Sequence, residues 1–315
     1  MHRLLITGGR GFVGRAVAAA AASNGYAVRI SSRLQAPTPM SAVELIQVAS
    51  QGPATDWSRA LEGIDCVVHC AGRAHVRSNA TDSLPAFQTV NVDGTLNLAR
   101  QAVAAGVRRL IFLSSVGVNG VETALGRRFC ETDPPAPHNA YATSKWQAEQ
   151  GLLAIANKSA LEVVLIRPPL VYGYAAPGNF GALVRAVHRR LPLPLGCVRN
   201  QRSLLALDNL VHFVLACASH PGAANQTFLV CDGQDVSTPE LVRALARAAG
   251  VHVALPCIPV PALRFAATML GKRDLWQRLC SNLQIDISKA RERLQWQPPV
   301  PVAAALHAAI MGENQ

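Results

Sequence analysis

The stretch that decides the fold is TGGRGFVG at residues 7–14, close to the start of the 315-residue chain. It follows a short apolar run, Arg3–Thr7, and opens an Ala-rich helical pattern, Phe12–Asn24. Glycines at Gly8, Gly11 and Gly14 allow a tight turn, a close approach of the backbone to a pyrophosphate, and close packing of helix on strand. The helix N-terminus adds backbone amide donors. The stretch therefore predicts a dinucleotide-binding βα junction.

Working outward, apolar runs alternate with helical patterns through the first half of the chain. Further strands are expected at Tyr26–Ile30, Val43–Val48, Asp65–Cys70, Leu110–Ser114 and Glu162–Arg167, and further helices at Val90–Ala105 and Tyr141–Ala156. Buried apolar strands that alternate with helices imply βαβ units. We predict an α/β fold with a Rossmann-type, doubly wound parallel sheet and a smaller, mixed α/β substrate domain at the C-terminal end.

The domain boundary is expected near residue 170, because prolines cluster from Pro168 onward and the segments become short and mixed. We assign residues 1–170 to the NAD(P)-binding domain and residues 171–315 to a nucleotide-sugar-binding domain. A segment near 225–232 is expected to return to the first sheet as a strand.

Composition excludes several classes of protein. Half of the residues are hydrophobic and only 16% are charged, which excludes a disordered chain. The net charge is +11, which indicates either a generic basic surface or attraction of an anionic ligand. The arginines are spread out and aromatic residues are only 5% of the chain, so a nucleic-acid partner is not expected.

The cysteines and the N-terminus indicate a cytoplasmic protein. The eight cysteines are scattered without a C-x-x-C pair, so we expect small buried residues of a reducing compartment and no disulfide framework. The chain opens directly on a strand and a glycine loop, which leaves no place for a signal peptide. No apolar run reaches the length of a membrane span, so stable membrane insertion is not expected.

The histidines do not predict a metal site. The chain has nine, and none lies in an H-E-x-x-H motif or in a Cys/His cluster with ligand spacing. His69 and His75 flank the Ala71-Gly72 pair and are near enough in sequence to touch a cofactor, but a structural role is favoured.

The residues after the second strand favour NADP(H) over NAD(H), although NAD(H) stays open. An acid about 20 residues beyond the glycine loop would bind the ribose hydroxyls of NAD. Here the strand ends Ile30-Ser31-Ser32-Arg33, and no acid follows before Glu44. Arg33 offers a guanidinium for a 2′-phosphate, and Arg10 in the glycine loop offers a second. The alternative is that both are ordinary surface arginines.

Three polar side chains predict acid/base chemistry. Ser114 and Ser115 close the fifth strand, at the edge where ligands bind in such sheets. Tyr141 and Lys145 are four residues apart on a predicted helix and so share one face. The Lys145 ammonium is expected to lower the pKa of the Tyr141 phenol, which would make Tyr141 a workable acid/base, while Ser115 binds the reacting sugar oxygen.

With these features the chain resembles the extended short-chain dehydrogenase/reductases, in the group of nucleotide-sugar epimerases and dehydratases. The resemblance covers essentially the whole chain. It rests on TGGRGFVG at 7–14, HCAG at 69–72, NVDGT at 91–95, the set Ser115, Tyr141 and Lys145, RPPLVYG at 167–173, RSLLALDN at 202–209, and DISKARERLQWQP at 286–298.

The resemblance implies roles for these positions. Ser115, Tyr141 and Lys145 match the catalytic trio. The resemblance also implies a cofactor site, which includes the two arginines discussed above. Its residues are Gly8, Arg10, Gly11, Phe12, Val13, Gly14, Arg33, Ala71, Gly72, Asn91, Ser114, Pro168 and Val171. Arg202 would reach the substrate diphosphate, with Asn179 as a second ligand and Arg278 or Arg273 as a third. Leu283 would lie near a position whose bulk limits acceptance of an N-acetyl group. A homodimer is also expected by resemblance.

Departures from the family pattern reduce the number of candidate reactions. Residues 49–53 lack the Asp and apolar pair that often binds adenine, and Asn119 replaces a usual aromatic residue. No Asp-Glu pair follows Ser115, so a dehydratase lacks its acid and base. Two reactions then use the same trio: an NADPH-dependent C4 reduction of a UDP-4-keto-6-deoxy-N-acetylhexosamine, as in bacterial O-antigen assembly, and a 4-epimerisation with captive NAD.

The reductase is favoured because the chain lacks the acidic residue that would bind the ribose hydroxyls of NAD. A hypothesis of another class, a non-catalytic NAD(P) sensor or an RNA-binding scaffold, is weakened because Tyr141 and Lys145 are both present.

Overall fold

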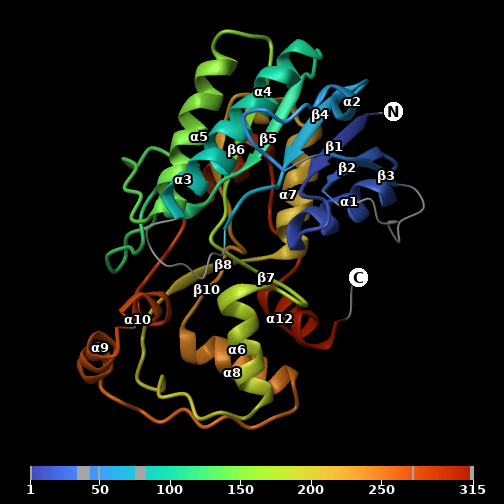
Figure 1. The fold of residues 1–315 in the computed structure, drawn as a ribbon. Coiled ribbons are helices and arrows are strands. Elements are labelled where there is room, and N and C mark those ends of the chain that lie inside the picture. Colours follow the sequence, from blue (N-terminus) through green and yellow to red (C-terminus); the bar gives the residue numbers. More distant parts are fainter. Residues whose placement is uncertain (1, 34–42, 49, 75–82, 272, 313–315) are drawn as a thin grey trace.

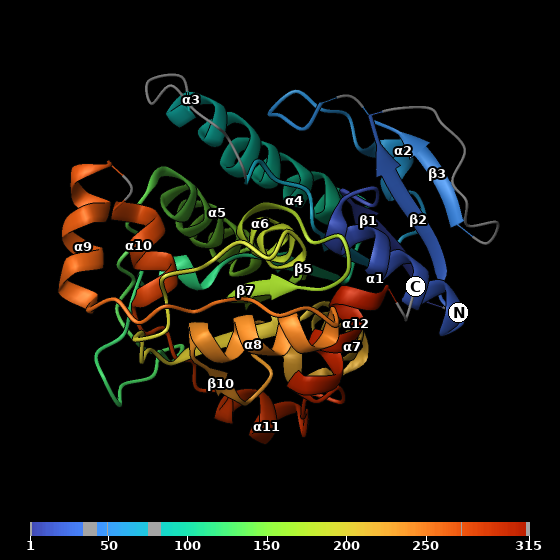
Figure 2. The same ribbon diagram turned by 90° about the horizontal axis from the view of Figure 1, so that it is seen from below.

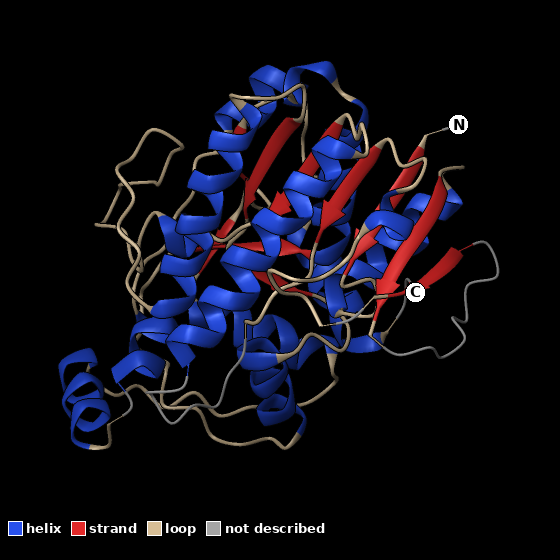
Figure 3. Ribbon diagram, turned by 45° about the horizontal axis from the view of Figure 1, so that its top comes forward, coloured by secondary structure: helices blue, strands red, loops and turns tan. Residues whose placement is uncertain are grey.

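A seven-stranded parallel sheet forms the centre of the protein in a computed structural model, which describes residues 2–33, 43–48, 50–74, 83–271 and 273–312 (Figures 1 and 3). Its order is β3-β2-β1-β4-β5-β6-β9. The strands are β1 (Arg3–Thr7), β2 (Ala27–Ser32), β3 (Val43–Gln47), β4 (Cys66–His69), β5 (Arg109–Leu113), β6 (Glu162–Arg167) and β9 (Thr227–Leu229). The predicted α/β fold with a doubly wound sheet is confirmed.

Helices cover both faces of this sheet, which explains why β4 and β5 are buried along their whole length. One face packs against α1 (Phe12–Ser23) and α7 (Leu207–Ser219). The other packs against α2 (Ser58–Leu61), α4 (Gly94–Ala104) and α5 (Ala140–Ala156). Strands enclosed in this way have no solvent-facing side, so their sequences are continuous apolar runs.

A second, three-stranded sheet lies below the first (Figure 1). It has the order β10-β8-β7 and is formed by β7 (Leu170–Tyr172), β8 (Arg202–Ala206) and β10 (Asp235–Val236). Pro168 and Pro169 separate β6 from β7, since proline cannot donate to a sheet. The helices of this part are α6 (Gly178–His188), α8 (Thr238–Ala248), α9 (Val260–Met269), α10 (Arg273–Cys280), α11 (Ser288–Leu294) and α12 (Val302–Met311).

A third apolar core joins the small sheet to its helices. It includes Tyr172 of β7, Leu204 of β8, Val242 of α8 and Leu306 of α12, all buried. The strand β9 comes from this later part of the sequence, yet it pairs with β6 in the first sheet. Among the described residues, no helix has both the length and the apolar character needed to cross a bilayer.

The helix predicted at 90–105 begins earlier than expected. α3 (Ser83–Phe87) leads into a π-helical segment, Gln88–Asp93, and then into α4. Pro85 lies in the first turn of α3, where a missing amide costs no helical hydrogen bond. The wider π turn carries Asn91, whose contacts are described below.

The cysteines match the prediction only in part, because Cys70, Cys130 and Cys280 are half-buried and two others are bonded to each other. Cys66, Cys217 and Cys231 are buried as expected. Cys197 and Cys257, however, form a disulfide, with their Cα atoms 4.7 Å apart. The sequence hides this pair because 60 residues separate them, and only the fold brings their loops together. Backbone hydrogen bonds from Leu193 to Ala254 and from Gly196 to Pro256 hold the two loops side by side.

Candidate active site

The glycine loop has the geometry that its sequence predicts. Gly8 adopts a left-handed φ of +66°, and a Cβ on it would come within 2.9 Å of the Ala71 backbone. A Cβ on Gly14 would lie 2.3 Å from the Gly8 carbonyl oxygen, so only glycine lets α1 pack so close to β1. Gly11 caps α1 without a side-chain hydrogen bond, which leaves the amides of the first turn of α1 for a ligand's oxygens.

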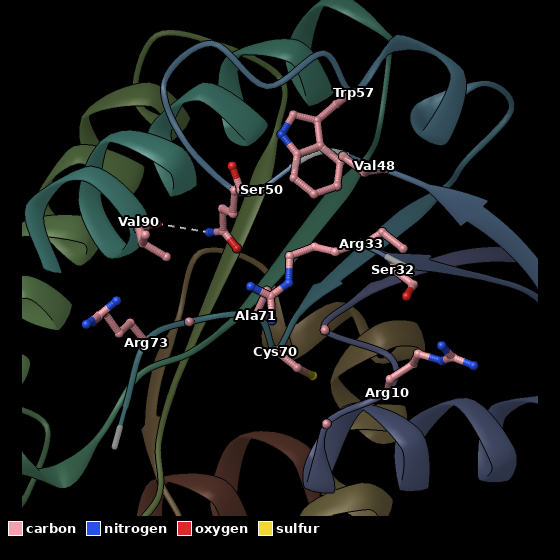
Figure 4. Close-up of a pocket in the computed structure, with 15 residues that line it drawn as sticks. Arg10, Ser32, Arg33, Val48, Ser50, Trp57, Cys70, Ala71, Arg73 and Val90 are labelled. Carbon is pink, nitrogen blue, oxygen red and sulfur yellow. Dashed lines mark hydrogen bonds between the residues drawn. The ribbon is translucent and has the colours of Figure 1, made fainter. Parts of the chain in front are cut away.

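A pocket of about 570 Å³ opens beside this loop (Figure 4). Six predicted cofactor residues line it: Gly8, Arg10, Gly11, Arg33, Ala71 and Gly72. They come from the β1–α1 loop, the end of β2 and the end of β4, which are neighbouring strands. The pocket therefore lies at the carboxyl edge of the sheet, where ligands bind in doubly wound folds.

The pocket wall also contains residues that the sequence analysis missed. Val48, Ser50, Gln51 and Trp57 line it after β3, the region where adenine contacts were in doubt. The Gln51 side-chain amide donates to the Val90 carbonyl over 3.1 Å, while its Oε1 is buried without a partner. The indole N–H of Trp57 is also buried without a partner. No short sequence motif predicts that these residues line a pocket, because they come together only when the loop after β3 folds over β4.

Among the described residues that line the pocket, three are arginines, namely Arg10, Arg33 and Arg73, and none is acidic. Arg33 is exposed at the end of β2, and its side chain extends across the pocket toward Ala71 in Figure 4. Arg10 is exposed as well and points away from the centre of the pocket in the same view. The electrostatic character of the pocket therefore favours an anion.

The structure brings the predicted catalytic trio to one place. Ser115 lies just beyond β5, and its Oγ accepts a hydrogen bond from the Gly117 amide over 3.1 Å. Lys145 donates from Nζ to the Leu113 carbonyl over 2.8 Å and lies 5.9 Å from the centre of the Tyr141 ring. Gly117 in turn packs on Ala142, the residue after Tyr141. The end of β5 and the start of α5 thus present all three side chains together.

The trio adjoins the pocket through Gly72. A Cβ on Gly72 would lie 3.5 Å from Lys145 Nζ and 3.4 Å from Asn91 Oδ1. Since Gly72 also lines the pocket, a long ligand can continue from the glycine loop to Tyr141.

The expected lowering of the Tyr141 pKa is wrong for the protein without a ligand. Burial raises the pKa of Tyr141 to about 12. Burial also lowers the pKa of Lys145 to about 8, against the opposing charges of Cys70 and Glu149. The Lys145 ammonium is committed to the Leu113 carbonyl, and desolvation of the phenol outweighs its attraction for a phenolate. The neutral phenol is the form that can donate a proton.

Asn91 and His69 form hydrogen bonds that join the elements around the site. Asn91 donates to Ser144 Oγ over 3.0 Å and accepts from the Arg73 amide over 2.8 Å, which ties the loop after β4 to α5. His69 is fully buried and bridges Thr7 and Thr95 through its two ring nitrogens. Burial, with the nearby Lys145 charge, lowers the pKa of His69 to about 3. His69 is therefore a neutral structural link, while His75 lies outside the described residues.

The remaining predicted cofactor positions lie around the same edge of the sheet. Ser114 is buried with its Oγ unpartnered, and the Pro168 carbonyl accepts from the Val116 amide over 2.9 Å. Val171 is half-buried in β7, and the Phe12 ring lies 3.4 Å from where a Cβ on Gly173 would be. Val13, the next residue of α1, is half-buried against the first core.

Asn119, which replaces an aromatic residue of the family pattern, completes a buried ion pair. Arg167 donates to both carboxylate oxygens of Glu149, over 3.0 and 2.5 Å, and to Asn119 Oδ1 over 3.0 Å. Glu149 is fully buried and Arg167 is 4% exposed. A polar side chain is needed at 119 because the guanidinium would otherwise have an unsatisfied N–H in the core.

The predicted substrate residues are not all brought together. Arg202 on β8 donates to the Ser281 carbonyl over 2.9 Å, and it pairs by a β-bridge with Leu283. Burial lowers the pKa of Arg202 to about 10. Leu283 is buried in the apolar core that joins the seven-stranded sheet to α1 and α7. Asn179 is exposed in the first turn of α6, and Arg273 and Arg278 are exposed on α10.

The residues present fit a nicotinamide dinucleotide. The glycine loop leaves backbone amides at the N-terminus of α1, and the pocket wall has an unpartnered acceptor in Gln51 and an unpartnered donor in Trp57. These groups suit a pyrophosphate and a base. Gly8, Gly11, Ala71 and Gly72 would hold the cofactor along the pocket.

Comparisons with known proteins find relatives of this chain. A sequence profile of the NAD dependent epimerase/dehydratase family matches residues 4–231. The chain is 41% identical over 299 residues to a UDP-glucose 4-epimerase from Vibrio cholerae, covering 94% of this chain and 90% of that protein.

Solved structures share the fold. A UDP-glucuronic acid 4-epimerase from Bacillus cereus in complex with NAD superposes with a TM-score of 0.79 at 19% identity, covering 98% of this chain and 97% of that one. The protein RMD from Pseudomonas aeruginosa complexed with NADPH superposes with a TM-score of 0.75 at 24% identity, covering 98% of each chain.

Proposed function

The chain belongs to the NAD dependent epimerase/dehydratase family and is an NAD(P)-dependent enzyme of nucleotide-sugar type. Within this family, we propose that it reduces a 4-keto-sugar nucleotide at C4 with NADPH. The proposed substrate is a UDP-4-keto-6-deoxy-N-acetylhexosamine of bacterial O-antigen assembly, and the proposed location is the cytoplasm. Residues 1–170 with β9 would hold the cofactor, and residues 171–315 would hold the sugar nucleotide.

The observation that carries this proposal is the charge of the cofactor pocket. Arg33 follows β2, where an acid would bind the ribose hydroxyls of NAD, Arg10 adds a second cation from the glycine loop, and no acidic residue is among the described residues that line the pocket. An acid there would repel a 2′-phosphate, whereas a guanidinium binds one with charge-assisted hydrogen bonds. A preference for NADP(H) suits an enzyme that consumes NADPH at each turnover rather than one that keeps a captive cofactor.

The trio supplies the proton chemistry. A reduced nicotinamide, when bound, supplies a hydride to the C4 carbon. The neutral Tyr141 phenol donates its proton to the C4 oxygen as negative charge develops there, and Ser115 Oγ donates a hydrogen bond to the same oxygen. Lys145 Nζ, held by the Leu113 carbonyl and 5.9 Å from the centre of the Tyr141 ring, would supply a positive charge near the phenolate that remains after the proton has left. Arg202 binds the diphosphate and sets the position of the sugar.

A second candidate is a UDP-hexose 4-epimerase that retains NAD. It is favoured by the similarity to the Vibrio cholerae protein, which bears that name. The same trio would serve this reaction, with Tyr141 accepting the proton of the C4 hydroxyl before returning it.

Two incubations separate the candidates. The reductase is expected to leave UDP-N-acetylglucosamine unchanged and to oxidise NADPH when a UDP-4-keto-6-deoxy-N-acetylhexosamine is added. Conversion of UDP-N-acetylglucosamine to the galacto sugar without added cofactor would instead establish the epimerase.

Cofactor choice has its own test. Arg33→Ser is expected to raise the KM for NADPH by about tenfold, the loss of one charge-assisted contact, and to leave the KM for NADH within about twofold. A wild-type enzyme that binds NADH more tightly than NADPH would reject the NADP(H) preference. Arg100, an exposed residue of α4 that is not among the pocket-lining residues, serves as a matched surface control as Arg100→Ser.

A further inference from the structure

The helices α9 and α10 form a hairpin whose apolar side chains face solvent. No residue of α9 is buried. Phe265 and Met269, four residues apart and so on one face, are 66% and 69% exposed, and Leu270 is 70% exposed. Leu275 on α10 adds a side chain that is 45% exposed. Figures 1 and 2 both show the hairpin at the outer edge of the second part of the molecule, far from α12.

Exposed apolar residues are concentrated in this hairpin. Four of the ten large hydrophobic side chains that are exposed among the described residues lie within residues 265–275. The other six are dispersed, at Leu84, Leu125, Leu170, Tyr174, Leu191 and Met311. Single exposed apolar residues are common in soluble proteins, whereas a contiguous group marks an interaction surface.

The hairpin is also basic. Residues 259–281 carry four cationic residues, Arg264, Lys272, Arg273 and Arg278, and one acid, Asp274. Arg264 stacks on Trp276 at 5.4 Å, which joins the two helices. A short helix with exposed apolar residues and nearby cations matches the surface of an anionic bilayer, where apolar groups enter the acyl boundary and cations contact the headgroups.

We propose that the α9–α10 hairpin docks the enzyme on the surface of a bilayer that contains anionic phospholipids. Phe265, Met269 and Leu270 would enter the interface, and Arg264 and Arg273 would contact phosphate headgroups. This goes beyond the proposed function, which requires only a soluble sugar nucleotide.

The hairpin is joined firmly to the substrate side of the enzyme. The Leu279 carbonyl, at the end of α10, accepts hydrogen bonds from Asn200 and Thr238. The Ser281 carbonyl accepts from Arg202. Docking would therefore hold Arg202, the residue proposed to bind the substrate diphosphate, close to the membrane surface.

A second copy of the chain fits this face less well than a bilayer does. The two helices have ten and eight residues, fewer than the roughly 20–30 residues a side of a stable interface. A two-fold contact would also place two copies of this basic surface against each other, and like charges across an interface are unfavourable.

The test is co-sedimentation of the full-length protein with vesicles, in the absence of substrate. The wild type is expected to bind vesicles of phosphatidylcholine with phosphatidylglycerol, and to bind vesicles of phosphatidylcholine alone, or the mixed vesicles at high salt, much more weakly. Phe265→Asp combined with Met269→Asp should weaken binding by about tenfold or more, because two apolar side chains no longer enter the interface. Met311→Asp, which changes an equally exposed apolar residue of α12, should leave binding unchanged.

Turnover of the soluble substrate and the melting temperature should match the wild type in both variants, since none of these residues touches the proposed site. Should the double variant fail to fold, vesicles with brominated lipids provide a second measurement. They should quench wild-type tryptophan fluorescence, and Trp276→Phe should remove most of that quenching. Absence of wild-type binding to anionic vesicles, equal binding by the double variant, or a dimer in light scattering that the double variant loses would each overturn the proposal.

Discussion

The proposed cofactor side and the proposed substrate side of this enzyme are built in different ways. Around the pocket, the glycine loop, the end of β2 and the end of β4 each contribute a short continuous stretch to one sheet edge. Around Arg202, each contact joins distant parts of the chain, since Ser281 is 79 residues away and the Thr123–Gln284 contact spans 161. Motifs therefore identify the first region, whereas the second depends on how the later helices pack.

The two regions also differ in burial. Strands β4 and β5 are buried along their length, and buried polar groups such as His69 and Glu149 are paired there. On the substrate side, Asn179, Arg273 and Arg278 are exposed. We therefore expect substitutions on the cofactor side to affect stability as well as catalysis, and those on the substrate side to affect mainly binding.

The largest effect is expected from Glu149→Ala, which leaves the Arg167 guanidinium buried without its partner carboxylate. Unpairing a buried charge should lower the free energy of unfolding by about 3–5 kcal/mol, as measured by urea titration. Glu44→Ala is the matched control, because the Glu44 side chain is 54% exposed and Arg29 keeps three backbone carbonyl partners. Glu44→Ala should lower the free energy of unfolding by less than about 1 kcal/mol. Equal losses in the two variants would remove the distinction between buried and exposed pairs.

Tyr141→Phe tests the chemistry at the junction of the two regions. Removal of the phenol proton should lower kcat by about 10²-fold or more, while the Kd for NADPH stays within about twofold. Steady-state kinetics and fluorescence titration of NADPH give the two values. Turnover near that of the wild type would show that another group donates the proton.

His69 predicts acid sensitivity of the cofactor side. Its pKa is about 3 in the folded protein and ordinarily 6.5, so the unfolded chain takes up a proton first as the pH falls. The folded state then loses about 1.4 kcal/mol of stability per pH unit below about pH 6.5, until the folded pKa is reached. His69→Gln removes this contribution, so unfolding free energies at about pH 7 and pH 5 should fall more steeply for the wild type than for the variant. Parallel falls would mean that His69 is not kept neutral by the fold.

The substrate side should give a smaller effect that is confined to binding. Arg202→Gln is expected to raise the KM for the sugar nucleotide by about tenfold with kcat within about twofold, because one charge-assisted contact to a phosphate is lost. Arg278→Gln, on the exposed face of α10, is expected to raise it less. If Arg202→Gln changed the KM for NADPH instead of the KM for the sugar nucleotide, Arg202 would belong to the cofactor side. The proposed division into two sides would then be wrong.

The sequence by itself determined the sheet, the glycine loop and the trio. In each case the physical reason is local: Gly8 needs a left-handed turn, apolar runs that alternate with helical patterns are typical of parallel strands, and Tyr141 and Lys145 share a helix face by spacing alone.

Only the tertiary structure decided the features that depend on distant contacts. Gln51 and Trp57 enter the pocket wall, Cys197 meets Cys257, and Lys145 donates to the Leu113 carbonyl instead of lowering the pKa of Tyr141. Burial sets that pKa, and burial is a property of the packed molecule that no spacing in the sequence records.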